Sequence, residues 1–199
     1  MFQKLSVTSP QDIRLLAVKH GIDTVNWLKA PEKLFTELCE EKVELGLSGS
    51  RLTMMVEFVR VEVYSPDQQW VLEEDYMVRH RDGKVGAKHF GRRSVSEKIL
   101  RTESFYETAS RGLHEELFWS FPPALLCHYA LNYLGRFSLP DRNHYAYSGL
   151  TVSGDEILFR ADLGLELYRP KYWEVQAEKT VYFNWFPVDV VLPNPKFNQ

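Results

Sequence analysis

The feature that most constrains the fold is the stretch LTMMVEFVRVEVYS, residues 52–65, which is rich in β-branched and apolar residues. Within it, Val59, Val61 and Val63 alternate with charged residues. Side chains that alternate in this way lie on opposite faces of a β-strand that has one buried face. The chain therefore builds a β-sheet, and the sheet begins where the character of the sequence changes near Arg51.

The sequence before this strand predicts helices over residues 9–50. Ser9 followed by Pro10 is typical of an N-cap and first helical position, and apolar residues then follow helical spacing up to a break at Gly21. A second amphipathic helix is predicted from about residue 31 to residue 45, ended by nearby glycines. These residues form a predicted helical extension, 1–50, that precedes a domain over 51–199.

The remaining sequence mixes strands with one further helix. A strand that turns at Asp82-Gly83 is the strongest hairpin signal in the chain. The next predicted elements are a charged loop (91–104) and an amphipathic helix (105–120). A strand (156–167), a polar and aromatic loop (168–179) and a last strand (180–191) are predicted in the C-terminal part. This order of helices, strands, a helix and strands predicts an α+β architecture rather than a repeating βαβ chain.

Composition excludes several classes of function. The chain has 199 residues, 24 basic against 27 acidic, so its charge of -3 argues against nucleic acid as the main partner. Cys39 and Cys127 have no partner at zinc-ligand spacing, which predicts free thiols in a reducing compartment. Neither a signal peptide nor a run of about 18 apolar residues is visible, so we expect a cytoplasmic protein without a membrane partner.

The motif RGLHEEL, residues 111–117, is the strongest candidate for chemistry. Glu115 and Glu116 are adjacent carboxylates, and Mg²⁺ needs only one or two carboxylates in addition to water and phosphate oxygens. Arg111, one helical turn earlier, is placed to orient Glu115. The same spacing is common on solvated helix faces, so both readings stay open. Gly112 counts against the solvated-face reading, because glycine inside a helix costs about 1 kcal/mol relative to alanine, and it indicates that another group approaches the backbone there.

Residues 97–119, EKILRTESFYETASRGLHEELFW, resemble a degenerate Nudix box, whose pattern is G-x5-E-x7-R-E-U-x-E-E-x-G-U with U a bulky apolar residue. The residues that match in type and spacing are Glu103, Arg111, Leu113, Glu115, Glu116 and Trp119. Glu97, Gly112 and Phe118 depart from the pattern. With looser flanking matches, the resemblance covers roughly residues 51 to 190.

The resemblance implies a Nudix-like mixed β-sheet sandwiched between helices, with the N-terminal segment as an addition. It also implies hydrolysis of a nucleoside diphosphate derivative or other phosphoanhydride with Mg²⁺ or Mn²⁺. Glu103, Glu115 and Glu116 would be the metal ligands, and Arg111 would join Glu115 and Glu116 in catalysis by fixing carboxylate geometry. Gly112 replaces a glutamate that completes the metal site or acts as base in usual members, so whether the chain is an enzyme stays open.

Four open readings follow from the same residues. Glu174 or Glu178 in the late loop would replace the missing carboxylate, or both would face solvent. Alternatively, the chain keeps the fold without the chemistry and binds a nucleotide, a protein partner or a second copy of itself. A basic cluster near the hairpin fits a phosphorylated small molecule, or it is an exposed turn; it comprises Arg79, Arg81, Lys84, Lys88, Arg92 and Arg93. In the last reading, this chain is an unrelated α+β domain whose charged helix only imitates the Nudix box.

Overall fold

The computed structural model describes residues 2–87 and 95–188, and its fold class is α+β, as the sequence predicts. The chain forms two compact units. The first comprises the chain up to Phe58 together with Lys98–Ser104 and Arg136–Ile157. The second comprises Val59–Glu97, Phe105–Gly135 and the chain from Leu158 onward. Both units therefore draw on separate parts of the sequence.

The first unit contains β1 (Phe2–Lys4), α1 (Pro10–Lys19), a 3-10 turn (Thr24–Asn26), α2 (Pro31–Cys39) and β2 (Glu44–Ser48). The second contains β4 (Trp70–Arg79), β5 (Val85–Ala87), α3 (Phe105–Leu113), the π-helical turn η2 (His114–Phe118), a 3-10 turn (Pro123–Leu125), β9 (Tyr172–Val175) and β10 (Lys179–Pro187). Four strands contribute residues to both units: β3 (Arg51–Tyr64), β6 (Val95–Lys98), β7 (Tyr129–Asn143) and β8 (Thr151–Leu163).

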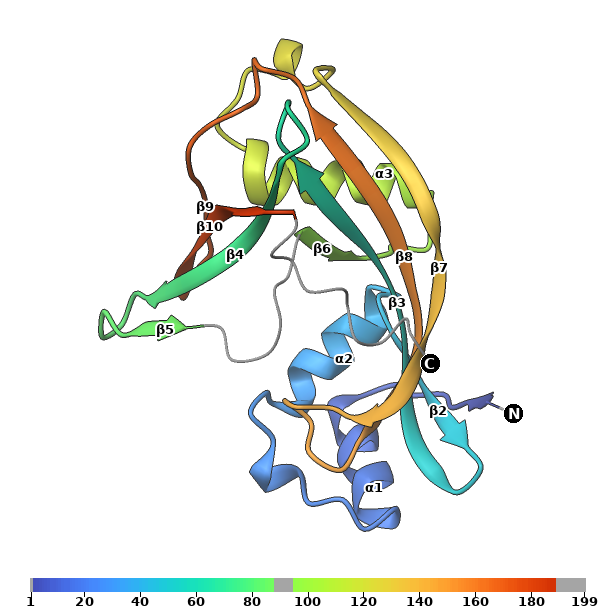
Figure 1. The fold of residues 1–199 in the computed structure, drawn as a ribbon. Helices are drawn as coiled ribbons and strands as arrows, with labels where there is room; N and C mark the ends of the chain where they lie inside the picture. The colour runs from blue at the N-terminus through green and yellow to red at the C-terminus, as the bar shows by residue number, and fades with distance from the viewer. Residues whose placement is uncertain (1, 88–94, 189–199) are drawn as a thin grey trace. The chain divides into compact units, whose positions relative to one another are not determined.

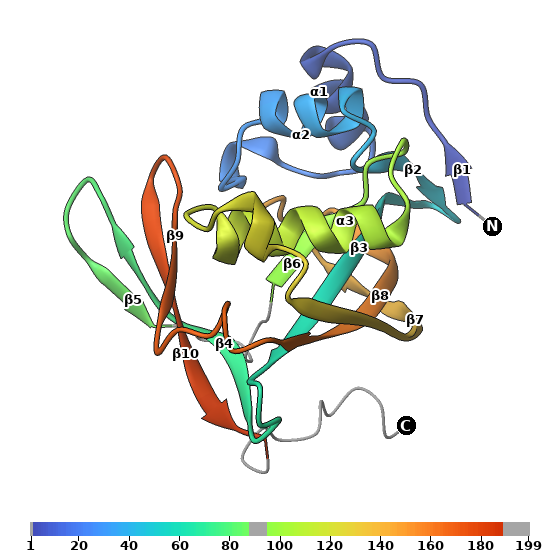
Figure 2. The ribbon, with the colours of Figure 1, turned by 90° about the horizontal axis from the view of Figure 1, so that it is seen from above.

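The N-terminal helices begin as predicted. The Ser9 side chain accepts a hydrogen bond from the Asp12 amide, and the Asp12 carboxylate accepts one from the Ser9 amide, which forms a capping box at α1. Gly21, at φ 70°, follows the end of α1 in the left-handed region that glycine favours. Figure 2 shows α1 and α2 lying side by side. Their buried faces meet apolar residues of β2 and β3 in one core.

The predicted second helix is too long. The helix α2 ends at Cys39, and residues 44–48 form β2, which pairs antiparallel with β1 and with β3. Leu45 and Met54 are paired across β2 and β3 and both are buried. Burial of this apolar pair and the backbone hydrogen bonds of two neighbouring strands outweigh helix propensity here.

The second unit is built on a hairpin and its partner strands. The predicted turn is present: Gly83 has φ 64°, and the Arg79 amide donates to the Lys84 carbonyl. The strand β4 pairs antiparallel with β5 and β10, and β10 pairs antiparallel with β9 (Figure 1). Two predicted loops are partly wrong, because the segment 91–104 contains β6 and the segment 168–179 contains β9. Both strands are only four residues long, too short for a clear periodic signal.

The predicted amphipathic helix is confirmed. Ala109, Leu113 and Leu117, spaced by four residues, are each at most 2% exposed and form its core-facing stripe. The helix is α-helical to Leu113 and then widens into the π-helical turn that carries both glutamates of the motif. None of the helices within residues 2–87 and 95–188 has the length and apolar character that crossing a membrane requires.

Candidate active site

The segment that resembles the box folds as a strand, a loop and a helix. The chain leaves β6 at Lys98, turns through residues 99–104, and enters α3 at Phe105. Arg111 lies in the last turn of α3, and Glu115 and Glu116 lie in the π-helical turn η2. Single π-helical turns within helices are rare and occur often at functional sites. The motif thus stands at the irregular end of a helix.

Gly112 has a packing role that the sequence alone suggests but does not specify. The helix passes so close to β6 that a Cβ atom at position 112 would lie 3.1 Å from Val95 Cγ1 and 3.2 Å from Glu97 Cβ. Both distances are shorter than ordinary carbon–carbon contact of about 3.5–4.0 Å. Figures 1 and 2 both show α3 running alongside β6. The glycine therefore permits close contact between this helix and strand, and a glutamate side chain would crowd that contact.

Arg111 joins two of the local carboxylates. Its Nη1 atom lies 3.3 Å from Glu97 Oε1 on β6 and 3.5 Å from Glu115 Oε2 one turn later. The Arg111 and Glu97 side chains are 22% and 24% exposed, whereas Glu115 is 53% exposed. Ion pairs that are partly withdrawn from water hold their geometry better than exposed pairs. Arg111 therefore ties the end of α3 to β6 and also reaches Glu115, as expected for a residue that orients carboxylates.

Glu116 is the most perturbed acid of the site. Burial raises the pKa of its carboxyl well above the usual range, and the Glu174, Glu74 and Glu97 carboxylates raise the pKa further. The Ser96 backbone amide donates to Glu116 Oε1 at 3.3 Å and opposes this shift. Like charges that converge in a partly dehydrated place disfavour ionisation. Such a group is a functional-site candidate on physical grounds.

Glu174 is brought into the same cluster by the register of β9. It stands opposite Val181, and Tyr172 opposite Phe183, so Glu174 belongs to the face of β9 and β10 that carries buried residues. Burial raises the pKa of Glu174, and nearby carboxylates add to this rise. The Gln176 amide donates to its carboxylate at 2.7 Å and opposes the shift.

Glu174 and Glu178, the two candidates to replace the carboxylate missing at Gly112, therefore differ in their surroundings. Glu174 acts electrostatically on Glu116, whereas Glu178 is exposed in the turn after β9, where its carbonyl accepts from the His80 amide. The signal for a strand at residues 172–175 was the high β-propensity of Tyr172, Trp173 and Val175, although four residues are too few to show which face Glu174 lies on.

The donor set fits a hard divalent cation in its chemistry. Glu116 and Glu174 offer carboxylate oxygens, which Mg²⁺ and Mn²⁺ prefer, and a cation would relieve the repulsion between them. Within residues 2–87 and 95–188, no group of three or more His, Cys, Asp and Glu side chains is arranged to hold a metal ion. A two-carboxylate site completed by water and phosphate oxygens is the usual arrangement for Mg²⁺, and it agrees with both observations.

A pocket of about 550 Å³ opens at the end of the π-helical turn. Its walls include Trp119 and Trp173, which are 48% and 47% exposed, and the basic residues Arg169 and Lys171. The Trp119 indole donates to the Trp173 carbonyl at 3.1 Å, which ties the helix end to β9. These two tryptophans are partly exposed pocket walls rather than core residues. Exposed indole faces beside cationic side chains suit a flat, anionic ligand.

The other predicted residues are distributed as follows. Glu103 belongs to the first unit, in the loop before α3, where its amide donates to the Leu100 carbonyl at 2.9 Å. Arg79 and Arg81 lie 3.3 Å and 3.9 Å from Asp82 at the hairpin tip. Three members of the predicted basic cluster, Lys88, Arg92 and Arg93, lie outside the described residues. Cys39 and Cys127 are free thiols, as predicted.

Comparisons with known proteins give no family assignment. No family model matches the sequence, and the search of curated proteins gave no match. Among solved structures, dihydroneopterin triphosphate pyrophosphohydrolase of E. coli has 18% identity and a TM-score of 0.45, over 68% of this chain and 82% of that one. A MutT structure described for Aliivibrio salmonicida and Vibrio cholerae has 10% identity and a TM-score of 0.28, over 67% and 80% of the two chains. RenU, a Nudix hydrolase of M. smegmatis, has 13% identity and a TM-score of 0.34, over 68% and 71%. Likenesses at this level are too low to carry an assignment.

Proposed function

We propose that the chain is a hydrolase that cleaves a phosphoanhydride with the help of Mg²⁺ or Mn²⁺. One observation carries the proposal: burial raises the pKa of both Glu116 and Glu174, which come from a helix end and a strand far apart in sequence, and the nearby Glu174 carboxylate raises the pKa of Glu116 further. Acids that only solvate a surface are not gathered in this way, whereas perturbed carboxylates are typical of catalytic sites. The resemblance of residues 97–119 to a Nudix box agrees with this chemistry.

Glu116 and Glu174 would hold the cation, with water and phosphate oxygens completing its coordination. The resemblance also implies Glu103 and Glu115 as ligands, but within residues 2–87 and 95–188 no three such acids are arranged to hold a metal ion. A bound divalent cation would polarise the phosphoanhydride and lower the pKa of a bound water. Arg111 fixes the position of Glu97 and Glu115 through its two ion pairs. Because Gly112 contributes no carboxylate, Glu174 is the residue that we assign to the missing role.

The substrate would be a phosphorylated small molecule or nucleotide derivative. The pocket beside η2 offers Trp119 and Trp173 for stacking on a ring. Arg169 and Lys171 line the same pocket and supply positive charge. Stacking and cationic groups in one concave place favour a ligand with both a flat ring and anionic oxygens.

The test is hydrolysis of a panel of nucleoside diphosphate derivatives with Mg²⁺ or Mn²⁺. Hydrolysis is measured as the release of phosphate, pyrophosphate or nucleoside monophosphate. Wild type is compared with Glu116→Gln and Glu174→Gln, and with Glu178→Gln as a matched exposed control. We expect metal-dependent turnover that falls at least about 100-fold in the first two variants, the scale of losing a base or ligand, and persists in the control. Equal activity in all four proteins would contradict the assignment.

A binding function without catalysis is the second candidate, and the packing of Gly112 favours it. The residue that usually carries a catalytic carboxylate here serves helix–strand contact instead. In that case wild type is inactive on the whole panel, while a nucleotide still quenches the fluorescence of Trp119 and Trp173. The same panel, read by fluorescence as well as by product release, separates the two functions.

A further inference from the structure

A second pocket, of about 670 Å³, is lined by residues of the first unit alone, and it shares no lining residue with the pocket beside η2. Its walls come from β1 and the residues after it, the end of α2, β2, β3, the loop 99–104, β7 and β8. Small-molecule sites measure about 300–1,000 Å³, so the volume suits such a ligand. The hydrolysis proposed above involves none of these lining residues.

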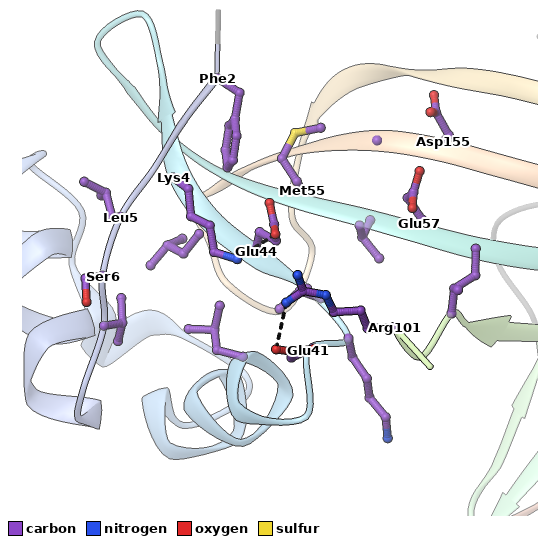
Figure 3. A pocket seen from close by; sticks show the side chains of 18 of the residues that line it. Phe2, Lys4, Leu5, Ser6, Glu41, Glu44, Met55, Glu57, Arg101 and Asp155 are labelled. Carbon is purple, nitrogen blue, oxygen red and sulfur yellow. Dashed lines mark hydrogen bonds and ion pairs between the residues drawn. The ribbon is translucent and has the colours of Figure 1, made fainter. Parts of the chain in front are cut away.

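The register of the sheet places several lining side chains on one face. Lys4 pairs with Gly46, and Glu44, two residues earlier on β2, pairs with Met55. Side chains of paired residues, and those two residues apart on a strand, lie on the same face of a sheet. The lining side chains that share this face are therefore Phe2, Lys4, Glu44 and Met55. Lys4 Nζ lies 2.6 Å from Glu44 Oε1, and Figure 3 shows these side chains in the pocket.

The apolar walls of the pocket are part of the packed core of this unit. Leu45 and Val56 are 1% and 8% exposed. The Phe2 ring lies against Gly46, where an added Cβ would collide with it. The Leu5 amide donates to the Leu45 carbonyl at 2.9 Å, which continues the pairing with β2 past the end of β1. Strand pairing and core packing thus hold the apolar walls in a fixed shape.

Charged side chains of both signs surround this apolar surface. Among the described residues that line the pocket, four are basic and four are acidic. Arg101 Nη1 lies 3.1 Å from Glu41 Oε1, the contact drawn in Figure 3. Arg136 pairs with both Glu57 and Asp155. The lining therefore carries no net formal charge, and bases and acids lie side by side in it.

A ligand can rearrange two of these pairs at little cost. Arg101 and Glu41 are 74% and 53% exposed, and Lys4 and Glu44 are 61% and 49% exposed. Ion pairs this exposed contribute little to stability. Within the described chain, Arg101 bonds through Nη1 and Glu44 through Oε1, which leaves further guanidinium donors and a second carboxylate oxygen for a ligand.

These charges select among ligands. A ligand with net charge meets repulsion from half of them, and an uncharged apolar ligand withdraws them from water without offering them a partner. We infer that the pocket binds a small zwitterion with apolar side chains, the chemistry of a dipeptide of apolar residues. Its carboxylate binds Arg101, and its ammonium group binds Glu44. Its apolar groups lie against Phe2 and Met55.

The first test is isothermal titration calorimetry of the full chain with leucyl-leucine, with its N-acetyl form and with its C-terminal amide. We expect leucyl-leucine to bind about tenfold more tightly than either blocked form, because each form lacks one charged hydrogen bond. Equal affinity for the three compounds would overturn the inference. Absence of leucyl-leucine binding at millimolar concentration would overturn it as well.

Two variants assign the ends of the ligand. Arg101→Gln should weaken leucyl-leucine binding about tenfold and leave binding of the amide form, which has no carboxylate, unchanged. Glu44→Gln should likewise weaken leucyl-leucine binding and leave that of the N-acetyl form unchanged. Arg14→Gln is the matched control, because Arg14 forms an exposed ion pair with Glu32 in the same unit but outside the pocket. An equal loss of affinity in Arg14→Gln would refute the assignment.

The position of the ligand is tested by the methyl resonance of Met55, identified by its absence in Met55→Leu. We expect leucyl-leucine to shift this resonance and to leave that of Met77, which lies on β4 in the second unit, in place. A shift of the Met77 resonance with none at Met55 would place the ligand elsewhere and overturn the inference.

Discussion

Gly112→Ala tests the contact between α3 and β6 directly. On a free helix the change stabilises by about 1 kcal/mol, because alanine loses less backbone entropy than glycine. Here the new methyl group would lie 3.1 Å from Val95 Cγ1 and 3.2 Å from Glu97 Cβ. Val95 is 1% exposed and Cβ belongs to the backbone frame of β6, so neither atom moves easily. Overpacking of this kind costs about 1–3 kcal/mol.

The two effects oppose each other, and the crowding is the larger. We expect Gly112→Ala to lower the free energy of unfolding by about 1 kcal/mol, the difference between a 2 kcal/mol mid-range overpacking cost and the helix gain. Removal of the Val95 methyl groups relieves one of the two contacts. In a Val95→Ala background the same change should therefore be about neutral, which gives a coupling of about 1 kcal/mol.

Urea unfolding followed by tryptophan fluorescence gives the four free energies of this double-mutant cycle. The comparison requires equal m-values, which show that the surface exposed on unfolding is unchanged. A Gly112→Ala protein that is more stable than wild type by about 1 kcal/mol would refute the close approach, since only helix propensity would then remain. Additivity of the two changes within about 0.3 kcal/mol would refute it as well.

Three further outcomes follow from the structure. The pKa of Glu116 is raised in the folded chain, so the folded state keeps a proton that the unfolded state has lost, and stability falls as the pH rises above 4.5. Glu116→Gln should therefore raise the melting temperature at pH 8 and reduce the slope of stability against pH. An unchanged slope in Glu116→Gln would contradict the burial of this carboxyl. Burial lowers the pKa of His144 to about 4, so the unfolded state takes up a proton before the folded state does as the pH falls from 6.5 to 4. The melting temperature of wild type should therefore fall over this range, and that of His144→Asn should fall less. Gly154 has φ 145° and its added Cβ would lie 1.8 Å from the Val56 carbonyl oxygen, so Gly154→Ala should cost at least about 3 kcal/mol in urea unfolding. Gly49→Ala, with open space around it and φ 63°, should cost only about 1–2 kcal/mol.

Much of the local structure follows from the sequence, because short-range chemistry decides it. The capping box at Ser9, the turn at Gly83 and the apolar stripe of α3 depend on neighbours within a few residues. Such features are visible as periodicity, caps and turn residues. The α+β class follows from their order along the chain. The cost of Gly112 within a helix also indicated in advance that another part of the chain comes close.

Other features were decided by contacts between residues far apart in sequence. Residues 44–48 form a strand because β1 and β3 lie on either side of it, not because of their own propensity. Glu174 joins Glu116 only through the register of β9 on β10. The pairing of Glu37 with Lys98 spans 61 residues. Sequence spacing shows which acids share one helix, whereas tertiary structure decides which acids converge, because convergence depends on the packing of separate segments.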